Sequence, residues 1–142
     1  MNFWQIAARR RLVNSRYLLD ASAVLALILD EPGADRVLPL LPASAITPIN
    51  LAEVVKKLRE KSVPLIEVEA TISDLQLPLE IGPTDFRHAL QVGEFAMSGR
   101  PVGLSMGDAV CLAAAAWSGR IAVTTERRWR DAFPLAAILA IR

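Results

Sequence analysis

Short apolar segments alternate with longer segments of helical composition along the whole of this chain. The first, residues 17–20, is apolar until it ends in Asp20, as expected for a buried strand. We predict further strands at residues 44–47, 77–81 and 121–124, and a last strand, or a short helix and a strand, at 135–141. Strands that alternate with helices predict an α/β fold, with a mostly parallel sheet covered on both faces and right-handed crossovers.

Capping residues set the bounds of the predicted helices. Thr47 is a predicted N-cap, followed by Pro48 at the first helical position. Thr84 caps another predicted helix, and Ser105 caps one that Gly119 ends. The predicted helices span residues 22–29, 34–41, 48–61, 64–75, 84–97 and 105–119.

The composition, 53% hydrophobic and 22% charged over 142 residues, is that of a compact domain. The uncharged run at residues 21–29 is far shorter than the ~20 residues that cross a bilayer. Asp20 interrupts the apolar stretch after the basic N-terminus, so we expect no signal peptide, no membrane association and a cytoplasmic protein. Cys111 is the one cysteine, which excludes a disulfide within the chain. We expect one domain over residues 16–142 and a loosely ordered extension over 1–15.

Basic residues form three clusters, although the net charge is only +1. Arginine predominates in them, and its planar fork of donors suits phosphate. Each cluster can also be a solvated helix face. The clusters lie at residues 9–11, at Lys56, Lys57, Arg59 and Lys61, and at Arg127, Arg128 and Arg130.

Four acidic residues lie at strand ends or near helix starts. Asp20 closes the first strand, Glu53 and Asp108 lie in early turns of helices, and Glu126 follows the strand at 121–124. In a doubly wound sheet these positions point to the carboxyl edge, where ligands bind. Acids gathered there repel one another unless a cation joins them, so the sequence predicts a metal site.

Each acid also has a purely structural interpretation. Asp108 forms a capping box with Ser105, Asp20 suits a turn, Glu53 suits a helix surface, and Glu126 can pair with a neighbouring arginine. If these interpretations are independent, it is much less probable that all four hold at convergent positions than that any one of them holds.

The remaining inventory narrows the chemistry. His88 is the only histidine; we interpret it as a helix-surface residue and Cys111 as a core residue, so neither a serine-histidine triad nor a zinc site is supported. No phosphate-cradling glycine motif is present. Carboxylate chemistry with Mg²⁺ or Mn²⁺ remains, since these ions take oxygen ligands and activate water.

Four segments occur in a characteristic order and spacing: LLDASA at 18–23, NLAE at 50–53, LSMGDAVCLA at 104–113 and VTTERRW at 123–129. Together they resemble the PIN-domain ribonucleases, specifically the VapC-type toxins of bacterial toxin–antitoxin pairs, and the resemblance runs from about Tyr17 to the C-terminus. It implies a three-layer α/β/α fold with a central parallel sheet. It further implies a Mg²⁺- or Mn²⁺-dependent endoribonuclease that cuts structured RNA, commonly transfer or ribosomal RNA, and a homodimer neutralised by a small antitoxin in the active-site groove.

Matched by position, Asp20, Glu53 and Asp108 correspond to the core acids of that family. Glu126 stands where the family usually has aspartate, and is longer by one methylene. The resemblance implies that Ser22 and Thr124 support the site by hydrogen bonds. A second departure is the extra N-terminal segment, which an upstream start codon or an arginine-bearing arm would each explain.

From the positions of the acids and this resemblance we expect Asp20 and Asp108 to hold the metal directly. Glu53 would complete its shell or orient the attacking water, and Glu126 would position a second metal or a water. The RNA-binding candidates are Lys56, Arg127 and Arg128.

Two rival functions stay open. In the first, Asp20 is the nucleophile of a phosphoryl-transfer domain, although Ser22 replaces the second aspartate of a D-x-D motif and no lysine lies beyond Lys61. In the second, the chain is a non-catalytic interaction module.

Overall fold

The computed structural model describes residues 1–80 and 85–142, apart from the side chains at positions 4, 8, 11 and 12. Its centre is a parallel sheet of four strands in the order β2-β1-β3-β4. The strands are β1 (Tyr17–Leu19), β2 (Ser44–Ala45), β3 (Ile121–Thr124) and β4 (Ile138–Ala140). The α/β class and the parallel sheet are as predicted.

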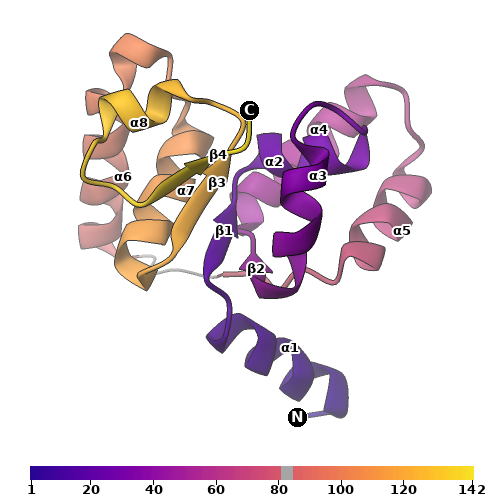
Figure 1. Ribbon diagram of the computed structural model, residues 1–142. Helices are drawn as coiled ribbons and strands as arrows, with labels where there is room; N and C mark the ends of the chain where they lie inside the picture. The colour runs from indigo at the N-terminus through magenta and orange to yellow at the C-terminus, as the bar shows by residue number, and fades with distance from the viewer. Residues whose placement is uncertain (81–84) are drawn as a thin grey trace.

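Alternating strand residues send side chains to the two faces of the sheet, and each face has its own core. Leu19, Ile46 and Val123 belong to the core beneath α2 (Ala21–Ile28), α3 (Ala34–Val37), α4 (Pro48–Glu60) and α5 (Leu65–Leu75). The opposite face packs against α7 (Met106–Ser118) and α8 (Arg128–Ala132), with α6 (Phe86–Ser98) outside α7. Figure 1 shows these two helical layers on either side of the sheet, which is the three-layer arrangement predicted.

Caps define the helices that carry the site. Thr47 accepts a hydrogen bond from the Asn50 amide at the start of α4, and Ser105 and Asp108 form a reciprocal capping box at the start of α7. Gly119 ends α7 with φ +67°. These three predictions are confirmed, and they matter because α4 and α7 present acids from opposite sides of the sheet edge.

The strand predicted at residues 77–81 was wrong over its described part. Only Leu79 pairs, in an isolated parallel bridge to Ile46, because Pro78 has no amide to donate to a ladder. The remainder of that strand and the predicted cap Thr84 lie outside the described residues; the observed N-cap of α6 is Asp85. A nearly buried ion pair between Arg120 and Glu80 holds this edge, and Arg120 also donates to Ser15 Oγ at 2.8 Å.

Several smaller elements were not predicted as such. Residues 38–43 form a 3₁₀ helix, Leu38–Ala43, where the helix predicted at 34–41 was expected to continue, and Arg100–Val102 forms another. The helix α1 (Phe3–Val13) lies within the expected extension, at the amino end of β1 (Figure 1). Among the described residues, no helix has the length and apolar character needed to cross a membrane.

Candidate functional site

Asp20 lies at the carboxyl end of β1, at the N-cap of α2, and is almost fully buried at 3% exposure. Its Oδ2 accepts a hydrogen bond from Ser22 Oγ at 2.7 Å and lies 3.3 Å from Thr124 Oγ1. Its Oδ1 is buried and has no hydrogen-bond partner in the described part of the structure. A buried carboxylate oxygen without a donor is costly unless a proton or cation meets it.

Ser22 and Thr124 connect Asp20 to the loop after β3. Their hydroxyl oxygens lie 3.3 Å apart. Ser22 Oγ accepts from the amide of Thr125 at 3.1 Å, and Thr124 Oγ1 accepts from the amide of Glu126 at 3.1 Å. The two hydroxyls therefore fix the Asp20 carboxylate and the loop that carries Glu126 in one network.

The electrostatics show which acids come together. Burial, and then the negative charges of Asp108 and Glu53, raise the pKa of Asp20 from 3.8 to about 7. Burial also raises the pKa of Glu53, with a contribution from Asp108. The pKa of Asp108 is raised by burial and by the charge of Glu126. Three acids from β1, α4 and α7 thus act on one another, and Glu126 joins them at the edge through Asp108.

Asn50, which the sequence analysis did not single out, holds Glu53. It is fully buried, donates from Nδ2 to Glu53 Oε2 at 3.3 Å and to the Gly107 carbonyl at 3.0 Å, and accepts from Thr47 Oγ1 at 2.5 Å. The amide side chain therefore ties α4 to the start of α7 and aims the carboxylate of Glu53 between them.

Gly107 is the second residue that was missed. A Cβ at this position would overlap the carboxyl group of Glu53. Glycine is therefore the one residue that lets Glu53 lie against the first turn of α7, next to Asp108. The signals in the sequence were a polar residue on the apolar side of α4 and a glycine in the first turn of a helix, and neither is informative without the distance between the helices.

The other predicted residues lie around this centre. Glu126 is exposed and pairs with Arg128, at 3.6 Å. Lys56 is exposed and pairs with Glu60, at 3.6 Å. Arg127 donates from Nε to the carbonyl of Arg142.

Cys111 and His88, which were not expected to take part in metal binding or catalysis, lie away from solvent to different degrees. Cys111 is fully buried and belongs to the core, as predicted. His88 is half-buried instead of lying on the surface, and its ring meets Trp117 edge to face, with centroids 3.8 Å apart.

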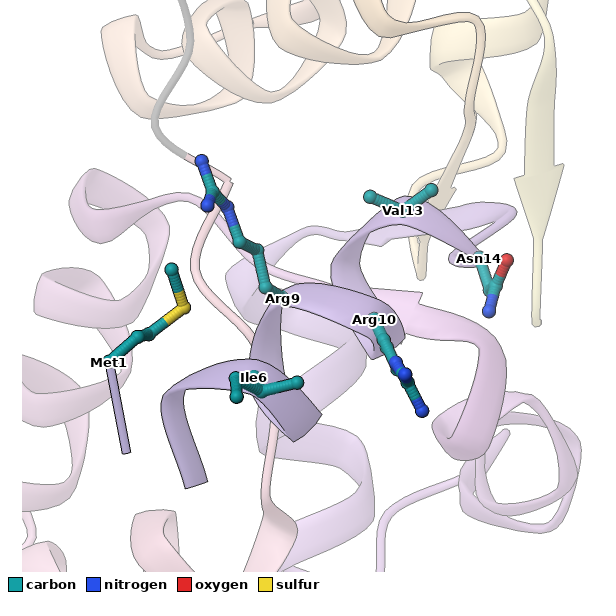
Figure 2. A pocket seen from close by; sticks show the side chains of 6 residues that line it. All are labelled: Met1, Ile6, Arg9, Arg10, Val13 and Asn14. Carbon is teal, nitrogen blue, oxygen red and sulfur yellow. The ribbon is translucent and has the colours of Figure 1, made fainter. Parts of the chain in front are cut away.

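The hollow shown in Figure 2, of about 600 Å³, lies elsewhere. It runs along α1 at the amino end of β1, and Arg9 and Arg10 point in different directions from it. The acids follow the carboxyl ends of the strands, so this hollow is not part of the candidate site. Its lining residues are Met1, Ile6, Arg9, Arg10, Val13 and Asn14.

The donors of the acidic site fit a hard divalent cation. The buried Asp20 Oδ1 has no partner, and the neighbouring side chains offer carboxylate oxygens. Within the described residues, no three acidic, histidine or cysteine side chains already form a closed metal-binding group. Mg²⁺ does not require one, since it keeps several waters and binds through one or two carboxylates.

Comparison with solved structures shows the same fold. A chain of VapBC-1 from nontypeable Haemophilus influenzae is 19% identical with a TM-score of 0.64, covering 88% of this chain and 97% of that one. A chain of VapBC2 from Rickettsia felis, bound to a DNA fragment from its promoter, is 18% identical with a TM-score of 0.63, and the match covers 87% of this chain and 97% of that one. PAE2754 from Pyrobaculum aerophilum is 21% identical with a TM-score of 0.61, and the match covers 88% of this chain and 83% of that one.

A search of curated proteins gave no match. A family model for the PIN domain matches residues 17–133, which include all four acids and most of the chain. The chain therefore belongs to the PIN domain family.

Proposed function

We propose that this protein is a VapC-type toxin, an endoribonuclease that hydrolyses phosphodiester bonds of structured RNA, either transfer or ribosomal RNA. Membership of a nuclease family and the fold shared with VapBC structures support the class. The observation that carries the proposal is the buried Asp20, which has one oxygen without a hydrogen-bond partner and whose pKa is raised by the charges of Asp108 and Glu53.

In this proposal Asp20 and Asp108 hold Mg²⁺ or Mn²⁺. Such an ion lowers the pKa of bound water and stabilises charge that develops on a phosphodiester. Asp20 suits the role because Ser22 and Thr124 hold one of its oxygens and leave the other free. The Ser105 amide in the capping box donates to Oδ2 of Asp108, so we assign metal binding to the other oxygen of this carboxylate.

Glu53 then acts on the attacking water. Its raised pKa suits a group that accepts a hydrogen bond from water, and Asn50 and Gly107 keep it in place. Glu126 lies further out and is exposed. We assign it to positioning a water or a second ion at the rim of the site.

Three basic residues are proposed to bind RNA phosphates. Lys56 and Arg128 are exposed but paired with Glu60 and Glu126, so phosphate must displace these contacts. Arg127 must leave the carbonyl of Arg142. Loss of one phosphate contact is expected to reduce the salt dependence of RNA binding by a slope of about one.

The proposal includes two protein partners and a cytoplasmic location. A small antitoxin would cover the acidic centre, which the resemblance implies and the VapBC complexes support. The resemblance also implies a homodimer.

Cleavage of total RNA tests the proposal. Wild type should cut with Mg²⁺ or Mn²⁺ and stop with a chelator, and Asp20→Asn should not cut under either condition. Asp74→Asn, which removes an exposed carboxylate of α5, is the matched control and should cut like wild type. Cleavage that persists in Asp20→Asn would contradict the proposal, and RNA binding without cleavage by wild type would support the non-catalytic module instead.

A further inference from the structure

The helix α1 lies in a concentration of positive charge that the proposed function does not use. This helix comes before residue 17, where the match to the PIN domain begins. Residues 1–19 contain four arginines and no acidic residue, whereas the other 123 residues contain 12 basic and 15 acidic residues, a net charge of −3. The chain therefore has a positive net charge only because of this segment, and the part that holds the acidic centre repels a polyanion overall.

Four exposed side chains of α1 lie on one face of the helix. Ile6, Arg9, Arg10 and Val13 have the spacing of neighbours on a helical face, since the last three follow Ile6 by three, four and seven positions. All four line the hollow of about 600 Å³ in Figure 2. Arg9 and Arg10 form no ion pair among the residues that the structure describes, so their guanidinium groups keep donors for a ligand.

The mixed character of this face indicates a nucleic-acid backbone as the ligand. A helix that lies on a membrane separates its apolar side from its basic side, whereas here the two arginines lie between Ile6 and Val13 on one face. A guanidinium group binds phosphate through its planar fork and stacks on bases, and apolar side chains beside it pack against sugars and bases. Arg9 and Arg10 point in different directions from the hollow, so they suit two different phosphates (Figure 2).

The end of α1 is attached to the sheet at a fixed place. Ser15 is buried at 8% exposure and accepts a hydrogen bond from Arg120 Nε at 2.8 Å. Seven positions separate Val13 from Asp20, so their Cα atoms lie at most about 25 Å apart. Structured RNA is long on this scale, since a double-stranded-RNA-binding domain contacts about 16 base pairs. One RNA molecule can therefore contact α1 and reach the acidic centre.

We propose that α1 is a second binding surface for the substrate RNA, with Arg9 and Arg10 bound to phosphates away from the cleaved bond. The inference rests on the proposed function, because the RNA is the substrate of the acidic centre. It adds a surface outside the PIN domain match, beyond the amino ends of the strands (Figure 1). Since α1 holds RNA without touching the reacting atoms, loss of its contacts should raise KM and leave kcat unchanged.

Binding of total transfer RNA by the full-length protein, measured with a chelator over a range of salt concentrations, tests the surface without cleavage. Arg9→Gln/Arg10→Gln should raise Kd by roughly tenfold at about 0.1 M salt and reduce the slope of the salt dependence by about two, one for each lost contact. Glutamine has a helix propensity close to that of arginine, so α1 should be retained. Arg9→Lys/Arg10→Lys keeps both charges and should keep the wild-type slope. Arg87→Gln/Arg100→Gln, the matched control, removes two exposed arginines at the two ends of α6 and should bind like wild type.

Cleavage kinetics and vesicle binding complete the test. With total RNA as substrate, Arg9→Gln/Arg10→Gln should raise KM roughly tenfold at an unchanged kcat. An unchanged Kd and salt slope in this variant, or an equal loss in the control, would overturn the inference. Wild-type binding to vesicles of phosphatidylglycerol and phosphatidylcholine that this variant loses, while RNA binding is kept, would assign α1 to a membrane surface instead. If wild type cuts RNA and the variant binds it equally well, only this inference fails; if wild type cuts none, the proposed function fails whatever the slope.

Discussion

Replacing Asp20 by asparagine should stabilise the metal-free protein at pH 8. The pKa of Asp20 is raised from 3.8 to about 7 by burial and by Asp108 and Glu53. A rise of this size corresponds to about 4 kcal/mol of destabilisation once the carboxyl group is ionised. Because the folded protein binds the extra proton between these two values, stability should fall as pH rises from about 4 to 7, and level off above.

Asparagine keeps much of the local structure while removing the charge. Its carbonyl oxygen can accept from Ser22 and lie near Thr124, as Oδ2 does now. Its amide then takes the place of the unpartnered Oδ1, which costs about 1–2 kcal/mol as an unsatisfied buried donor. The net gain expected at pH 8 is therefore about 2 kcal/mol, and the gain should disappear near pH 5, where Asp20 is mostly protonated.

Urea unfolding in the presence of a chelator, at pH 8 and pH 5, measures both values. Asp74→Asn on α5 controls for removal of an exposed charge and should change little at either pH. Added Mg²⁺ should stabilise wild type and leave Asp20→Asn unchanged, which reverses the order. If Asp20→Asn were no more stable than wild type at pH 8 without metal, the account of Asp20 as a strained buried anion would be refuted.

Three further changes test the residues around the site. Gly107→Ala should reduce RNA cleavage by roughly 100-fold, because the new methyl group displaces the carboxylate of Glu53, while the melting temperature changes little. Asn50→Leu should lower the free energy of unfolding by about 2 kcal/mol, since it leaves buried partners unsatisfied; equal stability in urea would contradict this. Glu80→Ala should lower the free energy of unfolding, measured in urea, by about 3 kcal/mol, because it removes one member of the nearly buried ion pair with Arg120; cleavage by the folded protein should be unchanged.

Features governed by local chemistry could be predicted from the sequence. The caps at Thr47 and Ser105 depend on side chains that reach amides three residues away, and both are present. The predicted strand at 77–81 depended on a partner strand, and β2 ends before it can pair with more than Leu79. The helix α8 is five residues long, too short for a helical period to appear in the sequence, and the buried Trp129 anchors it.

The sequence could predict which acids gather at the site, because their positions follow from where the strands end. Parallel strands bring Asp20 and the loop with Glu126 to one edge, and the helices that follow bring the other acids there. The supports of Glu53 could not be predicted, because Asn50 and Gly107 are 57 positions apart and matter through the distance between α4 and α7. The partners of Arg127 and Arg128 depend on side-chain directions that periodicity does not specify.

The capping box at Ser105 and Asp108 gives the site a natural reporter. The Ser105 amide donates to Asp108 Oδ2 at 2.9 Å, so one carboxylate both closes the end of α7 and faces the acidic centre. Any ligand that rotates this carboxylate away releases that amide to solvent. Hydrogen–deuterium exchange at a single backbone position would therefore follow occupancy of the centre without any substrate being present.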